Sequence, residues 1–270
     1  MGNVLEAIQK SQQQTPKPPA DPRSKNAAPA PVPVLRGRDP LPTVPAKTVK
    51  YDSALVAWHR RNGRMSEQYR ALRTHLLAHY HDKPFALIVT SAQSGEGKTV
   101  TCLNLAFTLA GMQECRTVVV DCDFRKGAVA SMLCDPAERG LADVLRGEAT
   151  PEEVIQPTPF PNLSVILTGK TSADEVGGLV SRQELDDLTR HLRRSYDHVL
   201  FDTPPVNTLS DAGVVGRVAG ESLLVVRMSK TRRESVRKAI RHLEAVNVKI
   251  AGLVLTNQKY YIPNYLYRYS

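Results

Sequence analysis

The sequence contains no apolar run that approaches the roughly 18 to 20 residues a membrane-spanning helix needs. It also has no apolar segment near its start of the kind found in a secretory signal, so we expect a cytoplasmic protein. Cysteine is scarce, and the four cysteines show no C-x-x-C spacing. This argues against a zinc site or a disulfide framework and predicts reduced thiols in the core.

Acidic residues are the scarcer charged class, with 27 Asp and Glu against 36 Lys and Arg, a net charge of +9. A basic chain favours anionic partners, but charge alone does not choose between phosphate groups, an acidic membrane surface and nucleic acid. Surface solubility is the simpler explanation of the excess.

Proline is unevenly distributed, with ten of the 19 prolines between Thr15 and Lys50. This composition predicts an extended, disordered linker over 15–50. Before it, Val4, Leu5 and Ile8 share one helical face and predict a short helix within 1–14. The remaining chain divides into a globular domain over 51–258 and a tyrosine-rich tail over 259–270.

The most informative stretch is Phe85–Val100, where an apolar strand pattern leads through small residues into a helix pattern. A glycine-rich loop between a strand and a helix N-terminus cradles phosphate groups with its main-chain N–H groups. Lys98 would reach the terminal phosphates, and the Thr99 hydroxyl would hold Mg²⁺. Ala92 stands where the usual motif has its first glycine, and alanine is small enough to be tolerated. The predicted nucleotide-binding residues are Ser94, Gly95, Glu96, Gly97, Lys98, Thr99 and Val100.

Carboxylates follow two further apolar strand patterns. Asp121 and Asp123 end the run from Arg116 and point to the same side of an extended chain. Asp202 ends the run from His198, which is the arrangement of a Walker B carboxylate that holds Mg²⁺. Since ligands bind at the carboxyl ends of strands in open α/β sheets, we expect these groups in one site.

Strand and helix patterns alternate along the globular part. Strands expected at Ser222–Val226 and Ile250–Leu255 are separated by a helix over Arg232–Val246. The predicted fold class is therefore α/β, a P-loop NTPase-like three-layer sandwich with a mainly parallel central sheet.

A helix is also expected within Tyr51–Tyr80, with Ser66 as its N-cap. Glu67, Arg70 and Arg73 recur along one face of this helix. From the residues alone, an ordinary surface ion pair is the favoured interpretation. A second helix, over Ser181–Tyr196, is expected to have Ser181 as its N-cap.

The chain has no N-K-x-D run, which guanine-binding proteins of this class would carry, so ATP is the favoured nucleotide. Five of the nine tyrosines lie near the chain end, at Tyr260, Tyr261, Tyr265, Tyr267 and Tyr269. A phenol acceptor needs a base, and a carboxylate can serve late in a loose transition state. Asp121 is the candidate base. Packing of these aromatic groups on the last strand is the alternative.

Several motifs together resemble the bacterial tyrosine kinases, or BY-kinases, of exopolysaccharide and capsule synthesis. They are SAQSGEGKT (Ser91–Thr99), VVVDCDFRK (Val118–Lys126), VLFDTPP (Val199–Pro205), EQYRALR (Glu67–Arg73) and the tyrosine-rich end. The resemblance covers about Met65–Ser270, with the motifs in the family's order.

The resemblance implies a protein-tyrosine autokinase that uses ATP and Mg²⁺. Lys98 and Thr99 would be Walker A groups, Asp121 the base, Asp123 a magnesium-associated carboxylate and Asp202 the Walker B carboxylate. It also moves Glu67, Arg70 and Arg73 from a surface ion pair to the interface of a ring-like homo-oligomer. The tail tyrosines would be phosphorylated in trans, and the rings would dissociate as charge accumulates.

Further partners are implied by the same resemblance. Because no membrane module is fused to the chain, the activator would be a separate membrane polysaccharide co-polymerase that recruits the kinase to the inner face of the cell membrane. A cognate phosphotyrosine phosphatase is expected, and nucleic acid is not. Ser94 stands where the family commonly has proline, and Thr168–Val180 lacks the usual proline-rich run.

Two other functions remain open. A ParA/MinD-like ATPase switch would share the fold, but such proteins carry a second lysine five residues before the Walker A lysine, where this chain has Gln93. A kinase-dead scaffold is the third possibility, although every expected catalytic group is present.

Overall fold

The computed structural model describes residues 50–134, 138–172, 174–180 and 183–257, which all belong to one compact unit. The predicted N-terminal helix, nearly all of the linker, the Ser181 cap and the five tail tyrosines lie outside the described residues. The domain boundaries therefore stay predictions.

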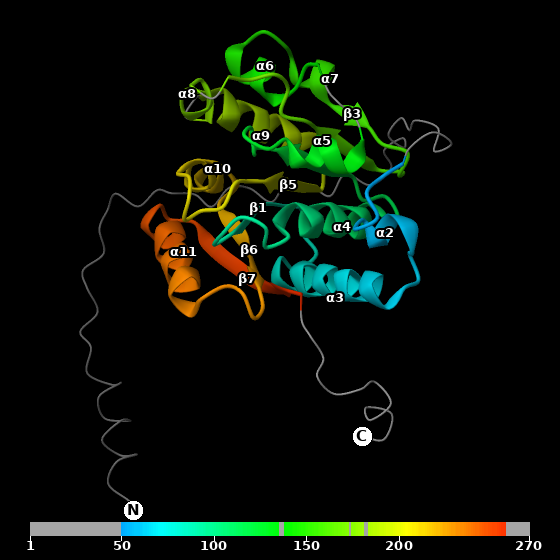
Figure 1. Ribbon diagram of the computed structural model, residues 1–270. Helices are drawn as coiled ribbons and strands as arrows, with labels where there is room; N and C mark the ends of the chain where they lie inside the picture. Colours follow the sequence, from blue (N-terminus) through cyan, green and yellow to red (C-terminus); the bar gives the residue numbers. More distant parts are fainter. Residues whose placement is uncertain (1–49, 135–137, 173, 181–182, 258–270) are drawn as a thin grey trace, which may run out of the picture. The chain divides into compact units, whose positions relative to one another are not determined.

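The centre of the fold is a seven-stranded sheet in the order β3-β4-β2-β5-β1-β6-β7 (Figure 1). All neighbouring strands pair in parallel except β3 with β4, which are antiparallel at one edge. The predicted α/β class with a mainly parallel sheet is confirmed. The strands are β1 (Phe85–Ser91), β2 (Thr117–Asp121), β3 (Gln156–Pro157), β4 (Leu163–Ile166), β5 (His198–Asp202), β6 (Glu221–Arg227) and β7 (Lys249–Thr256).

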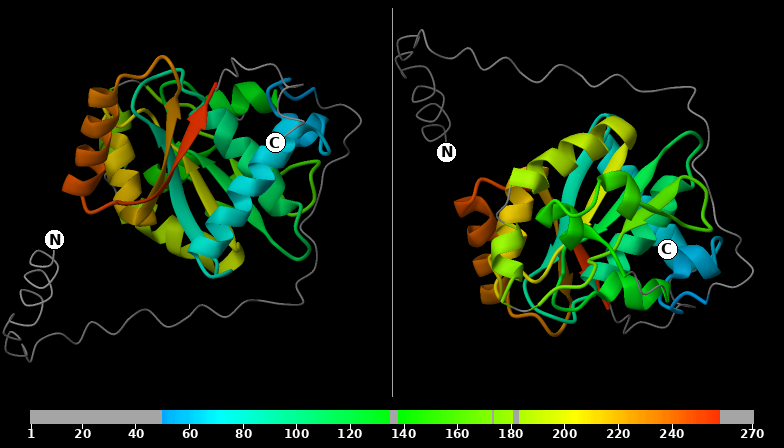
Figure 2. Two further views of the ribbon diagram at one scale, coloured as in Figure 1. Left: turned by 90° about the horizontal axis from the view of Figure 1, so that it is seen from below. Right: turned by 90° about the horizontal axis from the view of Figure 1, so that it is seen from above.

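Helices cover both faces of this sheet (Figures 1 and 2). They are α2 (Val56–His59), α3 (Arg64–His79), α4 (Lys98–Ala110), α5 (Ala128–Leu133), α6 (Leu141–Arg146), α7 (Pro151–Val154), α8 (Val176–Val180), α9 (Gln183–Ser195), α10 (Asp211–Ala219) and α11 (Arg233–Ala245). One core lies under α2 to α5 and the other under α6 to α11.

The two cores receive alternate residues of the same strands. Leu87 and Val89 of β1 enter the core under α4, whereas Ile88 enters the opposite core. All seven residues of β1 are buried, as expected for a strand covered on both faces. The three-layer sandwich therefore follows from apolar strands that supply side chains to the cores on both faces of the sheet.

The strand order brings the candidate site residues to one edge of the sheet. β1 and β2 both pair with β5, so the carboxyl ends of these three strands are neighbours. Asp121 of β2 lies in register with Asp202 of β5, which is also in register with Val89 of β1. The phosphate loop and the carboxylates therefore lie together at the carboxyl ends of the strands, where open α/β sheets bind ligands.

Some local predictions were wrong. Helix α3 begins at Arg64 after Gly63, not after Ser66, and the Ser66 hydroxyl instead donates to the carbonyls of Val56 and Arg60. These bonds join α3 to α2, a tertiary role that the capping pattern does not show. Cys102 and Cys122 are buried as expected, but Cys134 is exposed.

Candidate nucleotide site

The loop between β1 and α4 has the backbone shape that a phosphate cradle requires. Gly95 and Gly97 have φ angles of +79° and +93°, in the left-handed region that other residues rarely adopt. Gly97 is the N-cap of α4, so the helix begins at Lys98 with its first N–H groups directed toward the loop. The glycines predicted to shape this loop occupy the positions that need them.

Lys98 lies between two carboxylates. Its Nζ is 2.9 Å from Oδ2 of Asp123 and 3.4 Å from Oδ2 of Asp202, and all three side chains are buried. Burial by itself lowers the pKa of Lys98, but attraction to Asp202 and Asp123 outweighs it and raises the pKa above its ordinary value. The lysine is therefore held as a cation at the mouth of the loop.

Asp202 is linked to the first turn of α4. Its Oδ2 accepts a hydrogen bond of 2.7 Å from the Thr99 hydroxyl, and burial raises its pKa to about 6 against the opposing effect of Lys98. Its Oδ1 is buried without a hydrogen-bond partner among the described residues. An unpartnered carboxylate oxygen beside a hydroxyl and a second carboxylate, that of Asp123, suits a hard cation.

These oxygens fit Mg²⁺ in particular. Among the described residues, no group of three or more His, Cys, Asp or Glu side chains could hold a metal ion on its own. Mg²⁺ does not need such a group, because it usually keeps several waters and takes one or two carboxylates together with the phosphates of its nucleotide. Thr99, Asp123 and Asp202 would hold it.

The position of Asp121 at the end of a strand pattern suggested a carboxylate at the lip of the site, but the structure does not place it there. Its side chain is fully buried, with Oδ1 accepting from the N–H of Asp123 at 3.0 Å and Oδ2 from the N–H of Val129 at 3.2 Å. Burial, reinforced by Asp202, raises its pKa well above its usual range. In this geometry Asp121 holds the chain that carries Asp123 in place.

Glu96 joins the phosphate loop to two distant parts of the chain. Its buried carboxylate accepts hydrogen bonds from the Thr231 hydroxyl and from the Gln93 N–H. Its carbonyl accepts from the Thr256 hydroxyl at 2.7 Å. Sequence reasoning placed Glu96 in the loop but missed this role, because Thr231 and Thr256 carry no recognisable motif.

A cavity of about 750 Å³ adjoins the loop. Its lining includes loop and α4 residues such as Gly97 and Val100, together with Arg227, Thr256 and Asn257 at or just after the ends of β6 and β7. Apolar residues of α3 and β7, including the exposed Leu255, complete the lining. No pattern in the sequence predicted this cavity.

The three residues predicted for self-association lie on α3. Glu67 and Arg70 form an exposed ion pair, and the Arg73 Nη1 donates to the Thr108 carbonyl at 2.8 Å. Thr108 lies in the last turn of α4, whereas Lys98 and Thr99 of the nucleotide site begin that helix. The structure also shows that Arg73 has a role within its own chain.

Comparisons with known proteins identify the family. A family profile described as an AAA domain matches residues 86–251. The tyrosine-protein kinase YwqD of Bacillus subtilis is 32% identical over 195 residues, which cover 72% of this chain and 81% of YwqD. The chain belongs to the bacterial tyrosine-kinase family. The tyrosine-protein kinases ptk of Acinetobacter johnsonii and wzc of Salmonella are longer, and the chain spans 26 to 31% of their length.

Solved structures agree with this assignment. The kinase domain of Escherichia coli tyrosine kinase ETK superposes with a TM-score of 0.70 at 28% identity, covering 83% of this chain and 93% of that domain. MinD of Pyrococcus horikoshii, solved with Mg-ADP, has a TM-score of 0.57 at 24% identity and covers 67% of this chain and 75% of that chain, a likeness of fold alone. The tyrosine-kinase resemblance noted in the sequence is confirmed. Among its described residues, this kinase has no helix with the length and apolar character of a membrane span.

Proposed function

We propose that this tyrosine kinase transfers the terminal phosphoryl group of ATP to the tail tyrosines Tyr260, Tyr261, Tyr265, Tyr267 and Tyr269 of a neighbouring copy. The observation that carries the proposal is the buried cluster of Lys98, Thr99, Asp123 and Asp202 beside the glycine loop. Family membership sets the reaction class, and the tyrosine-rich end supplies acceptors.

The chain's own groups supply positioning and charge neutralisation, which are the main needs of phosphoryl transfer. Residues from Ser94 to Val100 surround the phosphates with main-chain N–H groups, and Lys98 exchanges part of its pairing with Asp123 and Asp202 for the terminal phosphate. A bound Mg²⁺ would supply further neutralisation of phosphate charge. The cavity between α4 and the ends of β6 and β7 has room for the base and ribose.

The acceptor proton requires a carboxylate near the transferred group. Asp121 was the first candidate, but both of its oxygens accept main-chain N–H bonds. Asp123 lies two residues further along and faces Lys98. We therefore assign the base to Asp123, with Asp121 positioning it through the bond from the Asp123 N–H.

The biological role follows from the family. We place the kinase in the control of exopolysaccharide or capsular polysaccharide synthesis, chain length and export. It would act in the cytoplasm, with recruitment to the membrane by a co-polymerase on a separate chain, self-association through Glu67, Arg70 and Arg73, and reversal by a phosphotyrosine phosphatase.

A mixing experiment tests transfer between copies. An active copy in which the five tail tyrosines are changed to Phe is combined with a Lys98→Met copy that keeps its tail, in the presence of Mg-ATP. We expect phosphotyrosine on the Lys98→Met copy, located by mass spectrometry within Tyr260–Tyr269. ATP hydrolysis without phosphotyrosine would instead favour the ParA/MinD-like switch.

The switch alternative has some structural support, namely the fold shared with MinD. Gln93 stands where such a switch would carry its second lysine, and its side-chain amide donates to the Ser235 hydroxyl of the same chain at 3.2 Å. In such a switch, the residue at this position would reach across a dimer bridged by nucleotide. The contact of Gln93 with Ser235 of its own chain does not favour that role.

A further inference from the structure

A second, smaller cavity lies on the opposite side of α3 from the nucleotide site. It has a volume of about 180 Å³ and shares no lining residue with the larger cavity. Its lining includes three guanidinium groups and two aromatic rings, from Arg61, Arg70, Arg73, Phe107 and Phe160. We call it the three-arginine pocket.

Arg73 presents an unused edge of its guanidinium group. Its Nη1 donates to the Thr108 carbonyl in the last turn of α4, which leaves the edge formed by Nε and Nη2. The Nε is buried and has no hydrogen-bond partner among the described residues. A buried donor without a partner is costly, and this edge matches two oxygens of a phosphate or carboxylate.

The neighbouring arginines add charge and an aromatic platform. The Arg61 guanidinium lies 4.6 Å from the centre of the Phe160 ring, a cation–π contact that leaves its N–H edges available. Arg70 is already occupied, because its Nε and Nη2 donate to Glu67 and its Nη1 donates to the Arg61 carbonyl. Three guanidinium groups are thus accompanied by one carboxylate, an excess of positive charge that matches the −1.5 to −2 on a phosphomonoester.

We propose that the three-arginine pocket binds a phosphotyrosyl side chain from the tail of a copy of this kinase. The phenyl rings of Phe107 and Phe160 favour an aromatic ester over phosphoserine, and the unused N–H edges of Arg61 and Arg73 take the phosphoryl oxygens. The source of the phosphotyrosine rests on the proposed function, whereas the pocket's chemistry does not.

The pocket shares residues with the proposed contact between copies. Arg70 and Arg73 line the pocket and also belong to the motif assigned to self-association. A phosphorylated tail would therefore compete with a neighbouring copy for the same guanidinium groups. Accumulating product would weaken self-association through a defined site, beyond general charge repulsion.

Peptide binding to the full chain tests this proposal. The five tail tyrosines are changed to Phe and no ATP is added, so the result does not depend on kinase activity. Peptides of residues 260–270, with and without phosphate on Tyr265, are titrated by fluorescence anisotropy. We expect the phosphopeptide to bind at least about tenfold more tightly. Equal binding of the two peptides would overturn the proposal.

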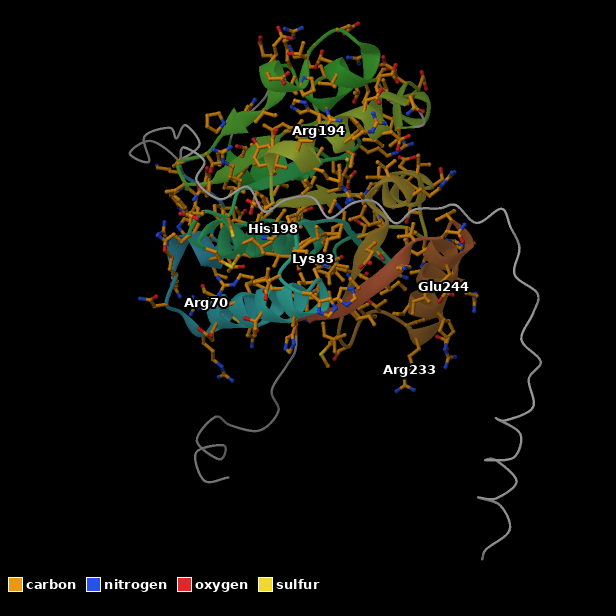
Figure 3. The ribbon with its side chains drawn as sticks, turned by 180° about the vertical axis from the view of Figure 1, so that it is seen from behind. Arg70, Lys83, Arg194, His198, Arg233 and Glu244 are labelled. Carbon is orange, nitrogen blue, oxygen red and sulfur yellow. The ribbon has the colours of Figure 1, made fainter. Side chains whose placement is uncertain are left out.

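Variants locate the site. Arg61→Ala and Arg73→Lys should each weaken phosphopeptide binding about tenfold, the second because lysine keeps the charge but lacks the two-donor edge. Arg233→Ala on α11 is the control and should change nothing, because Figure 3 shows Arg70 and Arg233 on separate helices at opposite sides of the sheet. Circular dichroism confirms folding of each variant. Unchanged binding in both Arg61→Ala and Arg73→Lys would refute the assignment.

Competition distinguishes the ligand class. Free O-phosphotyrosine should displace the phosphopeptide at a concentration at least about tenfold lower than O-phosphoserine or inorganic phosphate. Equal potency of the three compounds would show a general anion site and would contradict the aromatic part of the proposal.

Discussion

At the scale of single residues, Lys98 determines the electrostatic balance of the nucleotide site. It is the only basic group that the structure pairs with Asp123 and Asp202 among the described residues, and both carboxylates are buried. The residue assigned to phosphate binding is therefore also a stabilising element of the protein before any nucleotide is present.

We expect Lys98→Met to lower the free energy of unfolding of the nucleotide-free protein by on the order of 3 kcal/mol, because it leaves buried carboxylates without their cation. Urea unfolding without nucleotide measures the change. The double variant Lys98→Met with Asp202→Asn is the control and should recover part of the loss. Identical urea midpoints for Lys98→Met and the parent would show that the ion pairs contribute nothing.

His198 is a titratable residue with no assigned function, at the opposite end of β5 from Asp202. It lies at the start of β5, with its ring centre 4.5 Å from that of Phe85, and neither ring nitrogen has a hydrogen-bond partner among the described residues (Figure 3). Burial lowers its pKa to about 4, with Asp197 opposing the shift. The unfolded chain, with an ordinary histidine pKa near 6.5, therefore binds more protons than the folded one between these values.

The contribution of His198 to stability is accordingly complete above pH 6.5 and decreases as the pH is lowered toward 4. Relative to His198→Leu, the parent should lose roughly 2 kcal/mol of unfolding free energy between pH 7 and pH 5. Urea unfolding of both proteins at the two pH values gives this difference. The His75→Gln variant, changed at an exposed histidine, is the control and should behave like the parent. If the difference in unfolding free energy between the parent and His198→Leu does not depend on pH, this explanation is excluded.

At the scale of elements, the phosphate loop depends on residues from the opposite end of the chain. Glu96 receives hydrogen bonds from Thr231, in the segment between β6 and α11, and from Thr256 at the end of β7. The loop is therefore held by the segment after β6 and by the end of β7, which contribute no catalytic side chain.

We expect Glu96→Ala to weaken Mg-ATP binding about tenfold while the protein remains folded, because the loop loses the hydrogen bonds that the Glu96 carboxylate accepts from Thr231 and Gln93 and gains conformational freedom. A fluorescent ATP analogue measures the dissociation constant. Thr231→Val should give a smaller effect in the same direction. Glu234→Ala, which changes an exposed carboxylate nearby, is the control. If it weakens ATP binding as much as Glu96→Ala does, the Glu96 hydrogen bonds have no specific role in supporting the loop.

The strands β1, β2, β5, β6 and β7 and the glycine loop could be predicted from the sequence, because each depends on a local pattern. Apolar runs ending in Asp121 and Asp202 indicated two neighbouring strand ends, and the structure brings them into register. The partners of Glu96 and Arg73 could not be predicted, since these bonds join residues 135 and 35 positions apart. The burial of Asp121 was missed for a related reason, as its bonds depend on how the chain turns after β2.

At the scale of the whole molecule, self-association is proposed to depend on α3. Glu67 and Arg70 are already paired within one chain, so a contact with another copy must exchange or extend this pairing. Such surface pairs contribute little individually, and an interface would need several of them together.

We expect Arg70→Ala with Arg73→Ala to shift the protein toward smaller species in sedimentation velocity. Arg233→Ala with Arg237→Ala removes the same charge from α11 and should leave the distribution unchanged. Because Arg73 also bonds to Thr108, urea unfolding must show that the variant keeps its fold. A native oligomer in the folded double variant would remove Arg70 and Arg73 from the interface.

The hydrogen bond from Thr256 to Glu96 has a consequence for the geometry of the reaction. It joins the end of β7, which precedes the tyrosine-rich segment, to the loop that is proposed to bind the nucleotide. In the proposed reaction, a pull on the chain that follows Asn257 would thus be transmitted through Thr256 to the phosphate loop of the same copy.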